Sequence, residues 1–335
     1  MSSRLMRALV LDKAGKTPQL SVKEVPIPQP AHGEVLVRVE SAPINPSDLL
    51  YMEGRYAEDT KEGVTPGFEG SGVVVESGGG LLGWSLKGKR VACTITFPHG
   101  GTYAEYIVTQ AYRCAKLPNN VSFNEGACMF VNPLTVVMFQ DVISSGKHRA
   151  AIHTAAASAL GKMFARWGVS SGFPIVHVVR REEQVQTLRE LGAEYIVNTS
   201  EEGWEQEMDR LCEDLNVTVG FDAVAGELTG KVLNSVKNNG VVYVYGVLSM
   251  EGIQINPMDL IAKNKRAEGL YLGTWLVQKN ILKQINSIWK VQGMLGSLYK
   301  TDVAREVPLE EASEGIEYYK NNMSRGKVLI RPNLR

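Results

Sequence analysis

A turn built of small residues is the stretch of this chain whose composition and spacing point most directly to a chemistry. The segment TAAASALG, Thr154–Gly161, follows a short apolar run at Ala150–Ile152. A helix is predicted next, because apolar side chains recur at the spacing of one helical face, at Leu160, Met163, Phe164 and Trp167. A second apolar strand is predicted at Pro174–Val179. Strand, small turn, helix and strand form half of a dinucleotide-binding unit, in which the helix N-terminus offers free N–H groups to phosphates.

The fingerprint in this turn is degenerate. Where such units usually have Gly-x-Gly-x-x-Gly, this chain has Ala156, Ser158 and Gly161. Only the last glycine, which lets helix and strand pack closely, is kept. An ordinary buried strand–helix–strand crossover therefore stays open beside a phosphate-binding turn.

Two arginines at the end of the second predicted strand favour a phosphorylated ribose. A carboxylate about 20 residues beyond the glycines would accept a hydrogen bond from a ribose 2′-hydroxyl. This chain instead has Arg180 and Arg181, and Glu182 and Glu183 follow only afterwards. Two guanidinium groups suit a 2′-phosphate, through bidentate charge-assisted hydrogen bonds. The pair thus favours NADP over NAD, and the alternative is a solvated helix start of mixed charge.

The elements that precede this unit predict a compact β domain over residues 1–124. Val35–Val39 alternates with a period of two, which indicates a strand with one buried face, and Met6–Leu11 is a further strand. The segment Ala42–Tyr56 is predicted as a loop that leads into a short helix, which Ser47 can cap. Many short strands separated by Gly- and Pro-containing turns are typical of a barrel-like sheet.

Helices and strands alternate through residues 125–273, which predicts a parallel, doubly wound sheet. Its later strands are expected at Tyr195–Val197, Val217–Phe221, Val241–Tyr245 and Leu270–Leu272. Residues 274–335 are predicted to be mainly helical and to end in the strand Gly326–Ile330, which could return to the first domain. The expected fold class is α/β, with a β-barrel domain at 1–124, a dinucleotide-binding domain at 125–273 and a returning segment at 274–335.

Composition excludes several classes of function. The 36 Lys and Arg residues balance the 36 Asp and Glu residues, and no basic cluster predicts binding to nucleic acid. No apolar run reaches the roughly 18 residues of a membrane-spanning helix. The four cysteines are scattered, which indicates reduced thiols in a cytosol-like compartment. The segment MSSRLMRALVLDKAG lacks a signal-peptide pattern and is short for a transit peptide, so a cytoplasmic location is expected and a mitochondrial one stays open.

Several local motifs are shared with one known family. They are INPSD (44–48), GFEGSG (67–72), VNPLT (131–135), AAASALG (155–161), LRELGAEYIVN (188–198) and GKVLI (326–330). On these motifs, and on the order of its domains, the chain resembles the medium-chain dehydrogenase/reductase (MDR) superfamily. Within it, the chain resembles the zinc-independent branch of quinone oxidoreductases and 2-enoyl thioester reductases. The resemblance implies a GroES-like β-barrel domain and a Rossmann domain that binds NADP(H).

The residues argue against a catalytic zinc ion. Zinc-dependent members have a cysteine where this chain has Asn45 and a histidine where it has Phe68, and neither replacement is a zinc ligand. No ligand spacing relates the histidines His99, His148, His153 and His177. We therefore expect no metal. Asn45 could orient the substrate carbonyl or the nicotinamide, or it could only form the turn that opens the helix.

Without a Lewis acid, a developing alkoxide lacks a stabilising cation, whereas an enolate formed from a polarised C=C bond needs only a hydrogen bond or a proton. The resemblance implies that Tyr56 supplies it. In enoyl reductases a tyrosine follows the INPSD helix in a Gly-x-Tyr context, and GRY at 54–56 matches this context. The family's next glycine is Ala57 here, and a surface tyrosine without a role is the alternative. Tyr51 and Tyr103 are competing phenols.

The cofactor residues implied by the resemblance fall in short, separate stretches. They are Asn132 and Thr135 on the nicotinamide ribose side, Ser158, Ala159, Leu160 and Gly161 at the pyrophosphate, Arg180 and Arg181 at the 2′-phosphate, Tyr245, Gly246, Val247 and Leu248 after the fifth strand, and Leu270, Tyr271 and Leu272 beside the nicotinamide. A buried edge strand is the alternative for the last three. Lys327 matches a lysine near the cofactor phosphates, and a lone exposed lysine is the alternative.

Two enzyme activities and one role without catalysis stay open. The resemblance implies an NADPH-dependent reductase of an activated C=C bond in an enoyl thioester or an α,β-unsaturated carbonyl compound. An NADPH:quinone oxidoreductase would use the same cofactor with a flatter pocket, and a catalytically silent NADPH-binding or structural subunit is the third alternative. The expected partners are a small electrophilic substrate and a second copy of the chain. Sixth strands commonly pair across a two-fold axis in this family, and Leu270–Thr274 is apolar enough to do so.

Overall fold

The structure is a computed structural model that describes residues 4–56, 60–95 and 100–334; Ala57 and His99, discussed above, lie outside these ranges. The chain forms two compact units: Met1–Val131 with Ile288–Arg335, and Asn132–Ser287. The three domain ranges expected from the sequence stay predictions. Within the described ranges, no helix is long and apolar enough to cross a membrane.

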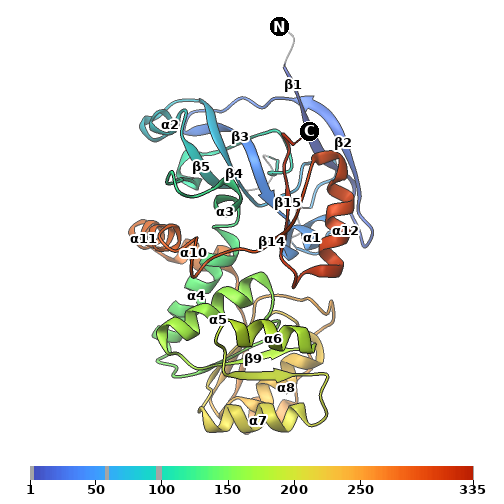
Figure 1. Ribbon diagram of the computed structural model, residues 1–335, viewed down its shortest axis with the longest axis vertical. Coiled ribbons are helices and arrows are strands. Elements are labelled where there is room, and N and C mark those ends of the chain that lie inside the picture. Colours follow the sequence, from blue (N-terminus) through green and yellow to red (C-terminus); the bar gives the residue numbers. More distant parts are fainter. Residues whose placement is uncertain (1–3, 57–59, 96–99, 335) are drawn as a thin grey trace. The chain divides into compact units, whose positions relative to one another are not determined.

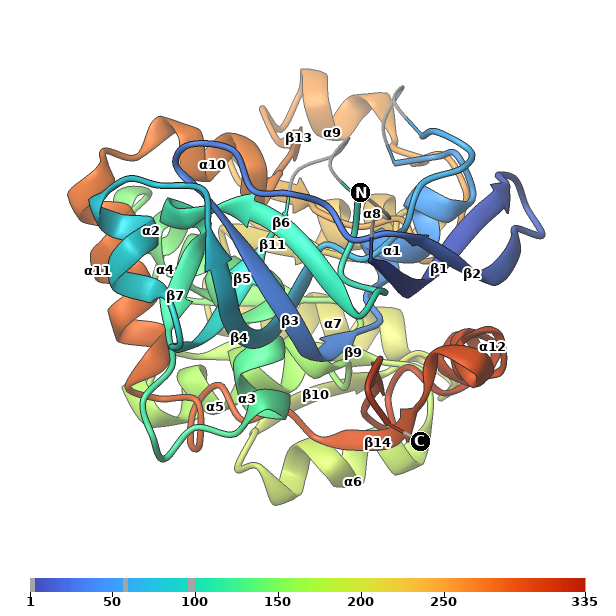
Figure 2. The same cartoon turned by 90° about the horizontal axis from the view of Figure 1, so that it is seen from above.

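The first unit is built mainly on antiparallel strands (Figure 2). In chain order they are β1 (Leu5–Lys13), β2 (Gln19–Pro26), β3 (Glu34–Pro43), β4 (Glu69–Ser77), β5 (Arg90–Thr94), β6 (Tyr106–Gln110), β7 (Cys114–Lys116), β14 (Val303–Val307) and β15 (Lys327–Ile330). The main sheet has the order β14-β15-β3-β4-β5-β7, β6 also pairs with β3, and β1 and β2 form a separate hairpin. Val35, Val37 and Val39 of β3 are buried in the main core, as their spacing predicts.

Short helices cover this sheet, and one of them begins at a residue other than the predicted cap. They are α1 (Pro46–Met52), α2 (Leu81–Leu86), η1 (Ala111–Arg113), α3 (Phe123–Ala127), η2 (Leu309–Glu311) and α12 (Ala312–Asn322). Asn45, not Ser47, is the N-cap of α1, and it forms a capping box with Asp48. Pro46 explains the difference, because proline at the first helical position has no N–H to lose and a preset φ. The cap is therefore the residue before it.

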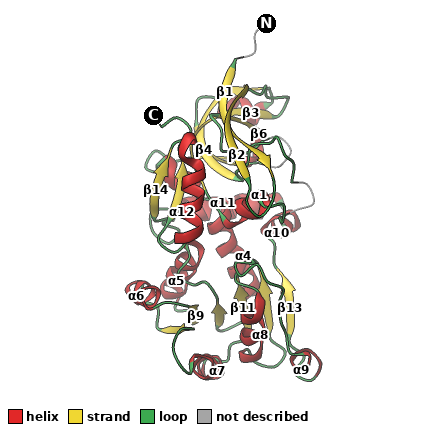
Figure 3. Cartoon of the chain, turned by 90° about the vertical axis from the view of Figure 1, so that its right-hand side faces the viewer, coloured by secondary structure: helices red, strands yellow, loops and turns green. Residues whose placement is uncertain are grey.

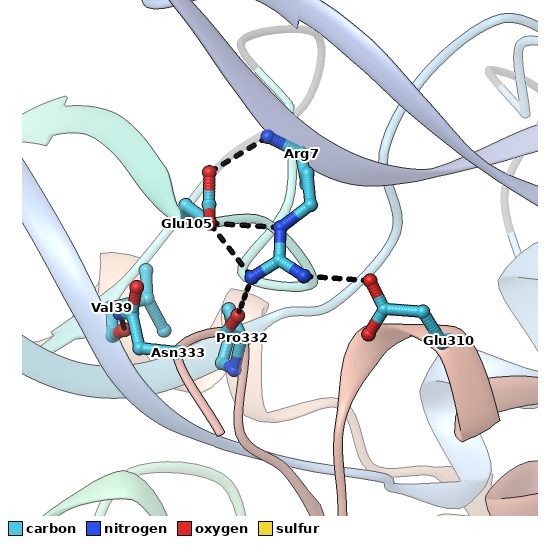
Figure 4. Close-up of polar contacts among 6 residues, drawn as sticks. All are labelled: Arg7, Val39, Glu105, Glu310, Pro332 and Asn333. Carbon is cyan, nitrogen blue, oxygen red and sulfur yellow. Dashed lines mark hydrogen bonds and ion pairs between the residues drawn. The ribbon is translucent and has the colours of Figure 1, made fainter. Parts of the chain in front are cut away.

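The C-terminal segment returns to the first unit, as the sequence predicts (Figure 1). In β15, Leu329 lies opposite Pro43 and Ile330 opposite Ala42 of β3. Figure 4 shows how the segment is fastened: the Arg7 guanidinium donates to Glu105, to Glu310 at 2.7 Å and to the carbonyl of Pro332 at 2.9 Å. The Asn333 amide donates to the carbonyl of Val39 at 2.7 Å.

The second unit contains a parallel sheet that is six-stranded over its described residues. Its strands are β8 (Ala151–His153), β9 (Ile175–Val179), β10 (Tyr195–Asn198), β11 (Val219–Asp222), β12 (Val241–Val244) and β13 (Arg266–Gly269). Their order in the sheet is β10-β9-β8-β11-β12-β13, and all neighbours are parallel. This is the doubly wound Rossmann order, whose direction of winding reverses between β8 and β11. Ligands bind such sheets at the carboxyl ends of the strands beside that reversal.

Helices cover both faces of this sheet. The helices in this part of the chain are α4 (Val131–Ser145), α5 (Ala159–Ser171), α6 (Glu182–Glu190), α7 (Trp204–Asp214), α8 (Gly226–Ser235), α9 (Pro257–Ile261), α10 (Leu272–Gln278) and α11 (Ile281–Gln292). One apolar core gathers side chains of α7 and α8, including Met208 and Val232. The other gathers side chains of α5 and α6, including Ala165 and Leu188. The predicted α/β fold class is confirmed.

The predicted position of the sixth strand is wrong. The strand is β13, and Leu272 already begins α10, with Tyr271 as its N-cap (Figure 3). β13 is an edge strand whose Arg266 and Glu268 are exposed, so it carries no apolar pattern that the sequence could reveal. The apolar residues Leu270–Leu272 follow it instead.

Candidate functional site

The small-residue turn lies at the carboxyl end of β8, beside the reversal of the sheet. Ser158 is the N-cap of α5, and its hydroxyl accepts a hydrogen bond from the N–H of Gly161 at 3.1 Å. A Cβ atom at Gly161 would lie 2.2 Å from the carbonyl oxygen of Ala156, so no side chain fits there. A tight turn of small residues that opens a helix at this edge fits the phosphates of a dinucleotide.

A buried aspartate connects the strand ends next to the turn. Thr154 donates from its hydroxyl to Asp222 at 2.6 Å, which joins the ends of β8 and β11. The carboxylate of Asp222 also accepts from the N–H groups of Val224 at 2.9 Å and Ala225 at 3.1 Å and from the hydroxyl of Thr229 at 2.6 Å. We did not predict a role for Asp222. An acidic residue directly after a buried strand, with a threonine after the neighbouring strand, was the available signal.

The two arginines lie at the carboxyl end of β9, the strand next to β8. Both side chains are exposed, and Arg181 is the N-cap of α6. The Nε atom of Arg181 is 3.2 Å from a carboxylate oxygen of Glu183, whose side chain is 64% exposed. Ion pairs at such exposure contribute little, so a phosphate can replace the carboxylate. The position and exposure of Arg180 and Arg181 fit a ribose 2′-phosphate.

The residues after β12 and β13 end at the same edge of the sheet. The N–H of Leu248 donates to the carbonyl of Ala223 at 3.0 Å, and the N–H of Leu270 donates to the carbonyl of Val244 at 2.9 Å. The side chain of Tyr245 points inward, where its hydroxyl lies 2.7 Å from Nε2 of His153. Burial lowers the pKa of His153 to about 3, so the imidazole is neutral, and burial raises the pKa of Tyr245 well above its usual value.

Helix α4 carries the two residues expected at the nicotinamide ribose. Asn132 and Thr135 share a helix face with Phe139 and are almost fully buried. The Phe139 ring stacks on Phe221 of β11 at 4.1 Å between centroids and lies 4.9 Å from the Tyr245 ring. Every predicted cofactor residue except Lys327 belongs to the second unit, and the role of these residues in holding the cofactor stays a prediction.

Three phenols compete for the catalytic role in the first unit, and their burial differs. Tyr51 and Tyr103 are buried, and the Tyr103 hydroxyl donates to the carbonyl of Pro43 at 3.1 Å. Tyr56 is half-buried, and its ring centroid lies 5.0 Å from that of Phe68. The N–H of Phe68 donates to Asp48 at 2.9 Å, which holds the ring that supports Tyr56.

Asn45 and Lys327 lie together inside the first unit. The Asn45 side chain is fully buried, and its Nδ2 donates to Glu69 at 3.0 Å. Lys327 is 1% exposed, and its ammonium donates to the carbonyl of Ile44 at 3.0 Å and to Oδ1 of Asn45. A place on the surface is therefore wrong for Lys327, because β15 carries it into the core, and its expected place near the cofactor phosphates stays a prediction. For Asn45 the geometry favours the turn that opens α1.

No group of three or more His, Cys, Asp or Glu side chains within 4–56, 60–95 and 100–334 could hold a metal ion. The four cysteines carry free thiols. Where zinc-dependent relatives are expected to have ligands, the chain has the buried Asn45 amide and the Phe68 ring.

Comparison with known proteins gives two family matches and close structural relatives. The families are described as "Alcohol dehydrogenase GroES-like domain", matched by residues 31–119, and "Zinc-binding dehydrogenase", matched by residues 159–287. A solved structure from Mesorhizobium loti, described as a candidate NADPH:quinone reductase, is 30% identical with a TM-score of 0.90, covering 99% of this chain and 100% of that one.

Two curated relatives have different activities in their names. The mitochondrial enoyl-[acyl-carrier-protein] reductase of Xenopus tropicalis is 29% identical over 82% of this chain and 79% of its own length. The quinone oxidoreductase of Lama guanicoe is 25% identical over 98% of both chains. With the GroES-like domain, the Rossmann sheet and these similarities, the chain belongs to the medium-chain dehydrogenase/reductase superfamily, in its quinone oxidoreductase and enoyl reductase branch, and is an NAD(P)H-dependent reductase.

Proposed function

We propose that the protein reduces the activated C=C bond of an enoyl thioester or an α,β-unsaturated carbonyl compound with NADPH. The observation that carries this proposal is the half-buried phenol of Tyr56, which packs on the ring of Phe68, one of the positions where zinc-dependent relatives have a ligand. A phenol can hydrogen-bond an enolate or deliver a proton, but it is no Lewis acid for an alkoxide. The similarity to an enoyl-[acyl-carrier-protein] reductase supports the same reaction.

We assign the cofactor to the carboxyl edge of the parallel sheet. Bound NADPH supplies the hydride. The turn 158–161 and the N-terminus of α5 bind the pyrophosphate, and Arg180 and Arg181 bind the 2′-phosphate. Asn132 and Thr135 hold the nicotinamide ribose, and the backbones of 245–248 and 270–272 line the nicotinamide side.

Tyr56 completes the reaction on the substrate side. Hydride addition to the β carbon leaves negative charge on the enolate oxygen of the substrate. The Tyr56 hydroxyl donates to that oxygen or transfers its proton to the α carbon, and solvent returns the proton to the phenolate. Phe68 holds the phenol in place, so its orientation is set before the substrate arrives.

A quinone is the second candidate substrate. The relatives from Mesorhizobium loti and Lama guanicoe, one a candidate and one a named quinone reductase, favour it. A quinone takes up the same hydride, and its charge develops on an oxygen that Tyr56 could also hydrogen-bond.

The oxidation of NADPH, followed optically, distinguishes these substrates. The protein is supplied with a medium-chain trans-2-enoyl-CoA, a medium-chain alkenal or a small 1,4-quinone. We expect turnover with the enoyl or alkenal substrate to exceed turnover with the quinone. A preference for the quinone would replace the proposed substrate, and no turnover with any acceptor despite NADPH binding would indicate a silent subunit.

We also propose a homodimer through the edge of the Rossmann sheet. In the described part of the second unit, β13 has a neighbouring strand on one side only. An uncovered strand edge is a template for pairing with a second chain. The exposed apolar side chains of Tyr271 and Val277 follow it in sequence. Pairing through Leu270–Thr274 as a strand is no longer part of this proposal, because Leu272 begins α10.

A further inference from the structure

A cluster of polar side chains is buried in the first unit, where a core would otherwise be apolar. Its members come from the α1 region, β4, α12 and β15, and all are at most 3% exposed: Asn45, Asp48, Glu69, Tyr319 and Lys327. We call it the Lys327 cluster. Neither the proposed reduction nor the cofactor assignment uses it. Buried charges need partners, so the arrangement of these groups is tightly constrained.

Lys327 and Glu69 fix the amide of Asn45 in one orientation. An ammonium only donates hydrogen bonds and a carboxylate only accepts them. Lys327 therefore faces Oδ1 of Asn45, and Glu69 faces Nδ2 at 3.0 Å. The ammonium also donates to the carbonyl of Ile44 at 3.0 Å and to the hydroxyl of Tyr319 at 3.4 Å.

Glu69 connects Asn45 to the beginning of α4 by hydrogen bonds. Its second carboxylate oxygen accepts from the N–H groups of Phe130 and Val131, both at 3.0 Å. Val131 is the first residue of α4, so the carboxylate satisfies N–H groups that the helix leaves unpaired and lies at the positive end of its dipole. Asn132 follows Val131 directly, and Thr135 lies about one helical turn further along α4.

Asp48 connects the cluster to Phe68, the residue on which Tyr56 packs. Its two carboxylate oxygens accept from the N–H groups of Asn45 at 2.7 Å and Phe68 at 2.9 Å. The cluster thus fixes the start of α1 and the ring of Phe68 at once. Both groups proposed to act on the reactants, the phenol and the first turn of α4, depend on it.

The charges of the cluster also indicate that Lys327 stabilises the ionised forms of Asp48 and Glu69. Burial raises the pKa of Asp48 to about 7 and raises that of Glu69, and Lys327 and the backbone N–H groups counteract both shifts. Burial lowers the pKa of Lys327, but Tyr319, Cys128 and Glu69 outweigh it, and the pKa is raised overall. Lys327 is therefore an ammonium, and without it the two carboxyl groups would bind protons more readily.

We propose that Lys327 is a positioning residue: through Asn45 and Glu69 its ammonium sets the first peptide groups of α4, and with them the two residues that orient the nicotinamide ribose. This rests on the proposed function for its effect on turnover. Most of the affinity for the cofactor is expected from its phosphates, which the turn 158–161 and the two arginines bind in the proposed site. Loss of Lys327 should therefore disturb the orientation of the nicotinamide more than the affinity for NADPH. A misplacement of about 1 Å is enough to slow a reaction about 100-fold.

The test compares Lys327→Met with wild type, with Lys320→Met as the matched control. Lys320 lies in α12 and pairs with Glu53 near the surface, outside the cluster. We expect Lys327→Met to lower kcat roughly 10- to 100-fold and to leave the Kd for NADPH, measured by fluorescence, within about threefold. The rise of kcat with pH should also occur at a higher pH in Lys327→Met than in wild type, because without the ammonium Glu69 and Asp48 keep the protons that disturb their hydrogen bonds up to a higher pH.

Hydrogen exchange of the Phe130 and Val131 amides, without cofactor, gives a readout that needs no reaction. We expect faster exchange there in Lys327→Met and unchanged exchange in β1 and β2. If Lys327→Met does not fold, Lys327→Met/Glu69→Gln removes both charges and should fold with the same low kcat. A folded variant with wild-type kcat, pH profile and exchange would overturn the proposal. A wild type inactive with every acceptor would defeat the proposed function, and exchange would still decide the role of Lys327.

Discussion

Among the phenols of the first unit, exposure decides which one can meet a substrate. Tyr51 and Tyr103 are 2% and 0% exposed, and burial raises the pKa of Tyr103 well above its usual value. Tyr56 alone of the three is half-buried, and it packs on Phe68. A proton donor to an enolate must reach the substrate oxygen, which the two buried phenols do not.

We propose that the arginine pair after β9 makes the protein prefer NADPH to NADH. Each charge-assisted hydrogen bond contributes about 1.5–3 kcal/mol. For Arg180→Ala/Arg181→Ala we therefore expect a KM for NADPH that is roughly 10- to 100-fold higher and a KM for NADH that changes less than about twofold. Steady-state kinetics with both cofactors measures this. Arg189→Ala, exposed in the last turn of α6, is the control, and an equal loss with NADH and NADPH would contradict the assignment.

Residue types revealed the surface chemistry of the site but not its buried chemistry. The exposed position of Arg180 and Arg181 after β9 could be predicted, because it follows from the end of an apolar strand, and their function at a 2′-phosphate stays a prediction. The burial of Lys327 and its proposed role depend on contacts such as that with the carbonyl of Ile44, a residue 283 positions earlier in the chain. The segment GKVLI predicts a strand, but no local pattern predicts that the side chain of its lysine is buried in the core.

At the scale of elements, the turn between β8 and α5 depends on one glycine. A Cβ atom at position 161 would overlap the carbonyl oxygen of Ala156, at 2.2 Å. We expect Gly161→Ala to lower the free energy of unfolding by about 1–3 kcal/mol, since the turn at Ala156 must move away from α5. NADPH binding should weaken as well, because the turn moves.

Urea denaturation and a fluorescence titration with NADPH check both effects of Gly161→Ala. Gly252→Ala is the matched control, since its added Cβ would meet nothing within 4 Å and its φ is not positive. Equal stability of the two variants would mean that the turn adapts, and the phosphate assignment would lose its geometric basis.

Element order could be predicted well and element edges less well. The alternation of apolar runs gave the βα order of the second unit, because buried strands such as β9 are apolar throughout. The exposed edge strand β13 was missed for the opposite reason. Pro46 moved the cap of α1 to Asn45, which local capping rules identify once proline is considered.

At the scale of the whole molecule, the uncovered edge of β13 predicts a two-fold dimer. Light scattering at micromolar concentration should give twice the 36.8 kDa of one chain. Val277→Asp, which places a charge on an exposed apolar side chain after β13, should shift the protein toward the monomer. Leu81→Asp, on α2 of the first unit, should not. A monomeric wild type would refute the dimer.

The order of the β domain and the Rossmann domain could be predicted from the sequence. The first unit has short strands with a period of two, and the second alternates apolar strands with helices. The return of β15 to β3 was predicted from an apolar run alone, and the ion pairs of Arg7 that fasten it were not. Such contacts join positions far apart in sequence, where no spacing rule applies. The same limit applies to Asp222, which ties two strand ends together.

The measurement that tests the central claim is kcat for a medium-chain trans-2-enoyl-CoA, or for whichever enoyl or alkenal substrate turns over, in wild type and Tyr56→Phe. Tyr112→Phe, 62% exposed on η1, is the matched control. We predict that Tyr56→Phe loses about 100-fold or more in kcat, with an unchanged Kd for NADPH, because the proton donor is gone and the cofactor site is intact. A Tyr56→Phe variant as active as Tyr112→Phe would contradict the account.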